Sequence, residues 1–156
     1  MITQQQFFQI LPLAVIWVEQ QEDYILQNGI PLTLSQIVEA KLIPVVNPER
    51  VRLLKVKQIP LPKEPLLRNA AQMIGLITAD TIGLTLRYGI FIRQDFWNDR
   101  RTIIHELVHV AQYERLGGIK QFLQKYLQEC ITIGYPQAPM EQEAIKLADR
   151  IVASNF

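Results

Sequence analysis

The sequence predicts an α+β fold in which helices at both ends of the chain surround a small, mostly antiparallel sheet. Helical patterns fill residues 1–28 and most of the chain after residue 99. Between them, the alternation of apolar and polar side chains over residues 81–93 is the clearest strand signal. The 156 residues suit one domain, so we expect a single domain over 1–156, with 1–48 as a helical N-terminal region packed on it.

Two helices are expected before the first strand. The first covers the first 28 residues, and Gly29 is its stop signal. A second, short helix follows Ser35. Its apolar residues are expected to face the core, and they are Ile37, Val38 and Leu42.

The middle of the chain carries the strand signals. Residues 51–57 (VRLLKVK) mix apolar and basic side chains with a period of about two, which is typical of a strand. A proline-rich connection leads to a helix over 66–74, which Gly75 could end. Residues 81–93 then predict a hairpin with its turn at Tyr88-Gly89.

Three helices are expected in the C-terminal part. The Asn-Asp pair at 98–99 offers an N-cap for a helix that runs to about Leu116. Two glycines at 117–118 interrupt it, and another helix follows over 119–133. A loop bounded by prolines separates that helix from a last one, which starts near Met140.

The composition is that of an ordinary globular protein, with 49% hydrophobic and 20% charged residues. A net charge of +1 argues against nucleic-acid binding by a broadly basic surface. The single cysteine, Cys130, excludes an internal disulfide and a four-cysteine zinc cluster. The apolar run at 10–18 has no basic residue before it and is far shorter than the ~20 residues that span a bilayer. We therefore expect a cytoplasmic protein without a nucleic-acid or membrane partner; the runner-up is a peripheral membrane protein held by its apolar N-terminal helix.

The segment TIIHELVHVA contains the motif HExxH, from His105 to His109. Positions i and i+4 lie on one helix face, so both imidazoles can reach one metal ion. Glu106 lies about 100° around the helix. It could accept the proton of a water activated by that ion, and pass it to a leaving amine. The alternative is a hydrogen-bonded buried cluster, or a solvated His–Glu face, without a metal.

A third ligand is needed, and no other histidine exists in the chain. A metzincin pattern would require glycine at 112 and histidine at 115, where the chain has Gln112 and Arg115. A carboxylate near the start of the last helix is therefore expected, either Glu141 or Glu143. Residues two apart on a helix point apart, so only one should face the metal; we expect Glu141, with Glu143 second. The alternative is a solvated acidic first turn.

The two segments TIIHELVHVA and EQEA together resemble the zincin metalloproteases of the gluzincin type. The resemblance covers about residues 80–150. It implies a zincin-like fold, with an HExxH helix and a downstream glutamate helix. It also implies that His105, His109 and Glu141 bind zinc (Zn²⁺) and that Glu106 is the catalytic base.

The chain departs from the gluzincin pattern at one position. The pattern ExxxD would require aspartate at position 145, where the chain has Ile145. Asp149 lies one turn further along the expected helix. The carboxylate that usually orients a ligand histidine is therefore missing or displaced.

In zincins, the edge strand before the active-site helix lines the substrate cleft. Here that strand would be residues 90–93 or their hairpin partner 84–87, and a peptide could add to it as an extended strand. The alternative is an ordinary hairpin. A hydrogen-bond donor for the developing oxyanion is also expected. Tyr135 is the first candidate and Tyr113 the second, although a tyrosine in either position is more often a packing residue.

The sequence therefore predicts a zinc-dependent metallopeptidase that hydrolyses a peptide or protein substrate. Glu106 would be the general base, and Tyr135 would donate a hydrogen bond to the developing oxyanion. The first alternative is a non-catalytic, zincin-like module that binds zinc and recognises a protein partner. A second alternative is a latent enzyme whose N-terminal helices cover the cleft.

Overall fold

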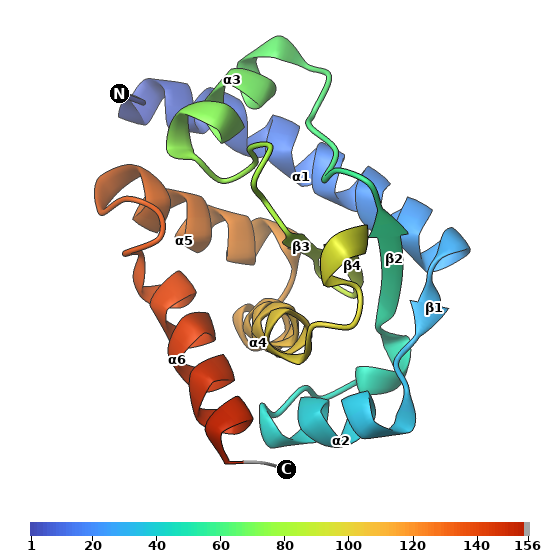
Figure 1. Cartoon of the computed structure of the whole chain (residues 1–156). Helices are drawn as coiled ribbons and strands as arrows, with labels where there is room; N and C mark the ends of the chain where they lie inside the picture. The colour runs from blue at the N-terminus through green and yellow to red at the C-terminus, as the bar shows by residue number, and fades with distance from the viewer. Residues whose placement is uncertain (155–156) are drawn as a thin grey trace.

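Six α-helices and a four-stranded sheet make up residues 1–154, the part of the chain that the computed structural model describes (Figure 1). The elements follow in the order α1 (Gln4–Asn28), β1 (Ile30–Pro31), α2 (Leu34–Leu42), β2 (Arg52–Val56), α3 (Pro65–Ile74), β3 (Gly83–Leu86), β4 (Gly89–Arg93), α4 (Arg100–Leu116), α5 (Ile119–Thr132) and α6 (Pro139–Ala153), with 3-10 turns at Pro48–Arg50 and Gln94–Phe96. The predicted α+β class and helical N-terminal region are confirmed. None of the described helices combines the length and hydrophobicity that a bilayer-spanning segment needs.

The helix that carries the HExxH motif, α4, begins and ends at the expected signals. The Asp99 side chain accepts a hydrogen bond from the backbone N–H of Thr102, which satisfies one of the free donors of the first turn. At the other end Gly117 adopts φ 101°, a left-handed conformation that costs glycine little. These signals fix the register of the motif within the helix.

The sheet has the order β1-β2-β4-β3 and is mixed rather than mostly antiparallel. The pairs β1–β2 and β3–β4 are antiparallel, as expected, but the longest pairing joins β2 and β4 in parallel. The chain passes through α3 between these strands, and such a crossover is what a parallel pair needs. Consequently β4 is an inner strand, and β3 lies at the edge of the sheet.

Two further details of the sequence prediction were wrong. Val38 and Leu42 are exposed on α2, because Ala40 and the half-buried Ile37 form its inward side. Val38 is one position from Ile37, about 100° around the helix, and Leu42 is two positions from Ala40, about 200° around. The hairpin turn is centred on Arg87 and Tyr88, one residue earlier than expected.

The two faces of the sheet carry separate hydrophobic clusters. Successive strand residues point to opposite faces, so Phe91 packs with α1 and α5, whereas Ile90 and Ile92 pack with α2, α4 and α6. Helix α4 contributes to both clusters, through Tyr113 to the first and Leu107 to the second. One side of α4 is thereby turned towards β3, α5 and the start of α6, where the candidate site lies.

Candidate metal centre

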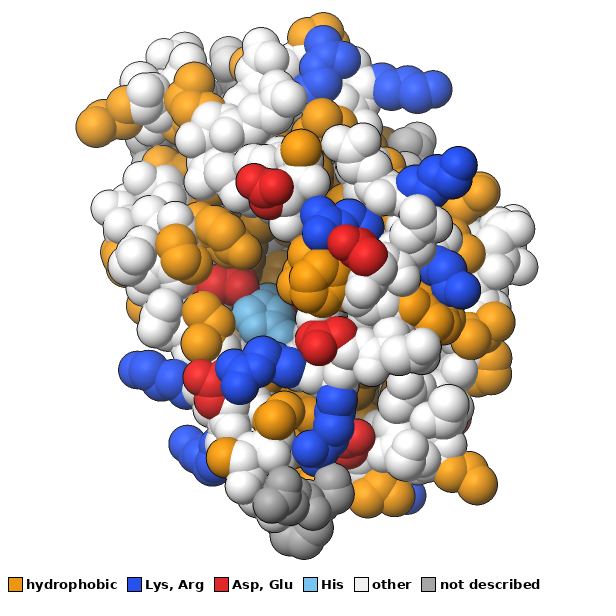
Figure 2. Space-filling model, in the orientation of Figure 1, with side chains coloured by type: hydrophobic (Ala, Val, Ile, Leu, Met, Phe, Trp, Pro, Cys, Tyr) orange, Lys and Arg blue, Asp and Glu red, His pale blue; other side chains and the backbone are white. Residues whose placement is uncertain are grey.

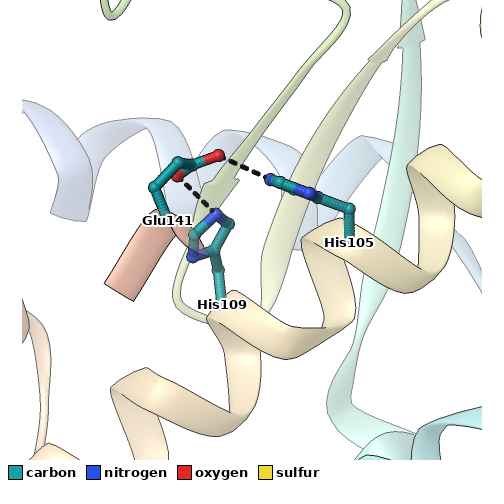
Figure 3. Close-up of side chains that lie close together, drawn as sticks. All are labelled: His105, His109 and Glu141. Atoms are coloured by element: carbon teal, nitrogen blue, oxygen red, sulfur yellow. Dashed lines mark hydrogen bonds and ion pairs between the residues drawn. The ribbon is translucent and has the colours of Figure 1, made fainter. Parts of the chain in front are cut away.

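Three predicted ligand residues meet between α4 and α6 (Figure 3). His105 and His109 project from successive turns of α4, and Glu141 faces them from the first turn of α6. His105 Nε2 lies 2.7 Å from one carboxylate oxygen of Glu141, and His109 Nε2 lies 3.1 Å from the other. Each of the three residues offers one ligand atom, and these three atoms all lie within 4.8 Å of one another. The spacing is compact enough for a single ion.

The start of α6 is held in place from two sides. The Glu129 carboxylate of α5 accepts a hydrogen bond from the backbone N–H of Met140, at 2.9 Å. From α4, the side-chain amide of Gln112 donates to the backbone carbonyl of the same Met140, also at 2.9 Å. Because Met140 precedes Glu141, these contacts position the carboxylate opposite the histidines.

Gln112 also fixes the orientation of His109. Its amide oxygen lies 2.7 Å from His109 Nδ1, while its amide nitrogen donates to Met140 and, at 2.6 Å, to Glu143. Both amide protons are used, so the oxygen is the atom that faces the histidine, and Nδ1 is the donor. His109 Nε2 is thus directed at Glu141, in the arrangement by which an outer partner orients a ligand histidine.

The orienting partner in this protein is an amide rather than the expected carboxylate. Asp149 forms an ion pair with Arg101 and does not contact either histidine. Glu143 lies outside the ligand group, because its carboxylate pairs with Gln112 and, at 3.0 Å, with Arg115, and its side chain is 44% exposed. The structure therefore brings Glu141, and not Glu143, to the histidines.

Charge within the cluster is balanced between His109 and Glu141. Burial disfavours the charged imidazole, but the hydrogen bond to Glu141 and the charge of that carboxylate outweigh it and raise the pKa of His109 to about 9. Burial also opposes ionisation of Glu141, yet its hydrogen bonds to both histidines hold its pKa far below the usual range. A carboxylate that stays ionised while buried is a favourable partner for a cation.

A tyrosine on α5 supplies a further contact to this carboxylate. The Tyr126 hydroxyl donates to Glu141 at 2.7 Å, and burial together with the charge of Glu141 raises the pKa of the phenol well above its usual value. The phenol therefore remains a neutral donor. Sequence reasoning missed it, since Tyr126 falls on the apolar face of an amphipathic helix and has the pattern of a core residue.

Glu106 lies beside the ligand group without belonging to it. One carboxylate oxygen, Oε1, accepts a hydrogen bond from the Thr85 hydroxyl of β3 at 2.8 Å. The other, Oε2, would lie 3.0 Å from a Cβ atom at position 83, so the glycine there leaves it room. Only 6% of Thr85 is exposed, so its hydrogen bond to Glu106 is buried. Glu106 thus sits between the edge strand and the histidines.

The cluster forms one end of a cavity of about 330 Å³. Figure 2 shows a histidine at a hollow, with acidic, basic and hydrophobic side chains around it. Both predicted helper tyrosines line the cavity. The Tyr113 hydroxyl, however, donates to the backbone carbonyl of Thr85 at 3.2 Å, and its ring stacks on Phe122. Tyr135 makes no hydrogen bond to the described residues, and burial, followed by the charges of Glu141 and Glu106, raises its pKa, so it stays a donor.

Comparisons of the chain with family models, with curated proteins and with solved structures found no match. The likeness to gluzincins therefore depends on the residues themselves, and any function for the site has to be argued from their chemistry.

Proposed function

We propose that this chain is a zinc-dependent peptidase with a zincin-like, gluzincin-type site. His105, His109 and Glu141 would hold the metal, and Glu106 would act as the general base. The observation that carries the proposal is the convergence of two histidines from one helix and a buried glutamate from another, beside Glu106, at the end of an open cavity.

The donor set fits zinc. Two imidazoles and one carboxylate are the protein ligands of one class of catalytic zinc site, in which the fourth position is left for water or substrate. The partners of those ligands fit as well, since Gln112 orients His109 and Tyr126 orients Glu141. Zinc, when bound, supplies Lewis-acid chemistry that lowers the pKa of water and polarises a carbonyl group.

The remaining steps fall to side chains of this protein. Thr85 occupies one oxygen of Glu106, so the second oxygen, Oε2, is the one that would take a proton from the attacking water and return it to the leaving amine. Tyr135 would donate a hydrogen bond to the substrate oxygen as negative charge develops on it. Both groups line the same cavity as the histidines.

The edge strand β3 offers a place for the peptide backbone. Ile82 pairs with Arg93 of the neighbouring strand, and because pairing alternates along an antiparallel ladder, the backbone groups of Gly83 and Thr85 point away from β4. The Tyr113 hydroxyl uses the Thr85 carbonyl. A substrate strand could form hydrogen bonds with the other outward-facing backbone groups of Gly83 and Thr85, as in other cases of strand addition. Residues 90–93, the other predicted cleft strand, belong to the inner strand β4 and cannot serve in this way.

The proposal is tested by zinc content and peptide hydrolysis together. Wild type should hold about one zinc per chain and cleave members of a peptide library. Glu106→Gln should keep the zinc but lose about 10²- to 10⁴-fold in kcat, the usual contribution of a general base. Glu49→Gln, the same change at an exposed position, is the matched control and should retain both properties.

A second candidate is a zinc-binding module without catalysis. The hydrogen bond from Thr85 to Glu106 favours it, because the would-be base already has a partner. Full zinc occupancy with no cleavage of any library peptide would support this candidate and contradict the peptidase. Turnover by the wild-type protein that is lost in Glu106→Gln would exclude the module.

A further inference from the structure

The cavity at the candidate site is chemically divided along its length. Its polar end holds the two histidines with Glu106 and Glu141. From there it continues between α1, α3 and α5, where Ala14, Ala71 and Leu127 are among the residues that line it. Helix α1 is a wall of this space rather than a removable cover, since its inward residues belong to the hydrophobic core.

Small residues make room at the apolar end. Ala14 of α1 and Ala70 and Ala71 of α3 are each less than 8% exposed and line the cavity. Larger side chains at these positions would fill the space between the two helices. The whole cavity, about 330 Å³, is at the lower end of the range of small-molecule pockets, so its apolar end suits one large side chain better than a longer ligand.

The apolar end of the cavity offers no partner to a charged occupant. The acidic and basic residues that line the cavity are Asp80, Arg101, which is paired with Asp149, and the groups of the candidate metal centre. None of the lining residues contributed by α1, α3 or α5 is charged. A charged group placed among them would lose its hydration without gaining a partner.

We propose that this cavity is the specificity pocket of the site, and that it selects peptides with a large, uncharged apolar side chain, such as phenylalanine or leucine, beside the scissile bond. The inference rests on the proposed function for its chemistry. A peptide is favoured over a lipid because the cavity is lined by the whole of β3, whose outer backbone groups can position an extended chain.

Binding can be measured independently of hydrolysis, because Trp17 lines the cavity and its fluorescence can report what enters. The other tryptophan, Trp97, is replaced in a Trp97→Phe background of the full chain. The probes are the N-acetyl amides of phenylalanine, leucine, alanine and glutamate, with N-octylacetamide as a lipid-like compound. The phenylalanine and leucine amides should bind at least about tenfold more tightly than the alanine amide, as expected for added apolar groups in a pocket. The glutamate amide should be the weakest.

Two variants should change this preference in opposite directions. Ala14→Leu fills the pocket and should weaken binding of the phenylalanine amide by about tenfold or more, with little change for the alanine amide. Leu127→Ala enlarges it and should shift the preference from the leucine amide towards the larger phenylalanine amide. Ala153→Leu, the same change at an exposed position of α6, is the control. Because the shifts are opposite, partial unfolding of one variant could not produce both.

The outcomes separate this inference from the proposed function. Hydrolysis of a peptide library by the zinc-loaded protein without preference for apolar residues would overturn the inference and leave the peptidase standing. Binding of the phenylalanine amide with the expected variant pattern, but no hydrolysis, would support the pocket and contradict the peptidase. Tighter binding of N-octylacetamide than of the phenylalanine amide would overturn the inference in favour of a lipid. Equal affinity for the alanine and phenylalanine amides would also overturn it.

Discussion

Glu22 and Glu141 are buried to the same extent, with 3% of each side chain exposed, yet their partners differ in kind. Glu22 accepts two hydrogen bonds from the Arg87 guanidinium, at 2.8 and 2.7 Å, and one from the backbone N–H of Tyr88. Glu141 faces two imidazoles and a phenol at comparable distances. Burial and distance alone therefore do not distinguish a structural carboxylate from a candidate ligand.

The chemistry of the partners makes the distinction. A guanidinium and a backbone N–H group are donors that keep their protons, so the partners of Glu22 cannot become metal ligands. The pair joins α1 to the β3–β4 turn, where Arg87 has φ 58°, and it has a structural role. An imidazole can give up its proton and offer a lone pair instead. Only the cluster at Glu141 can therefore exchange protons for a metal ion.

The largest effect is expected from Glu141→Gln, which removes the anionic ligand but keeps the shape of the side chain. Zinc affinity should fall by at least about 10³-fold, because losing even an orienting partner costs about 10- to 100-fold and a ligand contributes more. Competition with a chelator of known affinity measures it. Glu22→Gln, the same change at the other buried carboxylate, should alter zinc affinity less than about threefold. If Glu141→Gln lowered zinc affinity by less than about tenfold, Glu141 would not be a ligand, and its contrast with Glu22 would be wrong.

Glu22→Gln should act on stability instead. The free energy of unfolding should fall by about 2–3 kcal/mol, below the 3–5 kcal/mol typical of a broken buried pair, because the Arg87 side chain is 37% exposed and can be rehydrated. Urea unfolding of the metal-free protein measures it. Zinc should then stabilise this variant as much as wild type, since ligand binding to the folded state adds independently. If zinc no longer stabilised Glu22→Gln, the clusters at Glu22 and Glu141 would be coupled, and the independence expected here would be contradicted.

Gln112→Leu should have an intermediate effect on zinc affinity. Without the amide, His109 loses the acceptor that orients it, and zinc affinity should fall by about 10- to 100-fold. The visible spectrum of the cobalt-substituted protein should change as well, because it reports the ligand geometry directly. Gln121→Leu, at an exposed position of α5, is the matched control. If the cobalt spectrum and the zinc affinity were both unchanged, Gln112 would have no role in orienting His109.

The parts of the site that could be predicted are those encoded by local spacing. His105 and His109 share a face because four residues make about one helical turn, and the caps at Asp99 and Gly117 are readable in the sequence. Elimination of other ligands points to a carboxylate of the last helix, but the assignment of Glu141 rather than Glu143 depends on a resemblance. The structure separates the two through the packing of α6 against α4, which no local pattern encodes.

The rest of the arrangement depends on tertiary contacts between distant segments. Thr85 reaches Glu106 across 21 positions of sequence, and Tyr126 reaches Glu141 across 15. The sequence around Thr85 or Tyr126 has no pattern that would indicate its role at the site. The parallel pairing of β2 with β4 was missed for the same reason, since strand alternation predicts a strand but not its neighbour.

The smallest effect is expected from Glu143→Gln, two residues after Glu141. The Glu143 side chain is 44% exposed and its partner Arg115 is 56% exposed, so their ion pair should contribute less than about 1 kcal/mol to stability. The amide oxygen of the introduced side chain can still accept a hydrogen bond from Gln112, which also keeps its contact to Met140. Zinc affinity should therefore change less than about threefold, in contrast to Glu141→Gln. A loss above about tenfold would mean that the charge of Glu143 acts on His109 through Gln112, and that an exposed carboxylate belongs to the site as well.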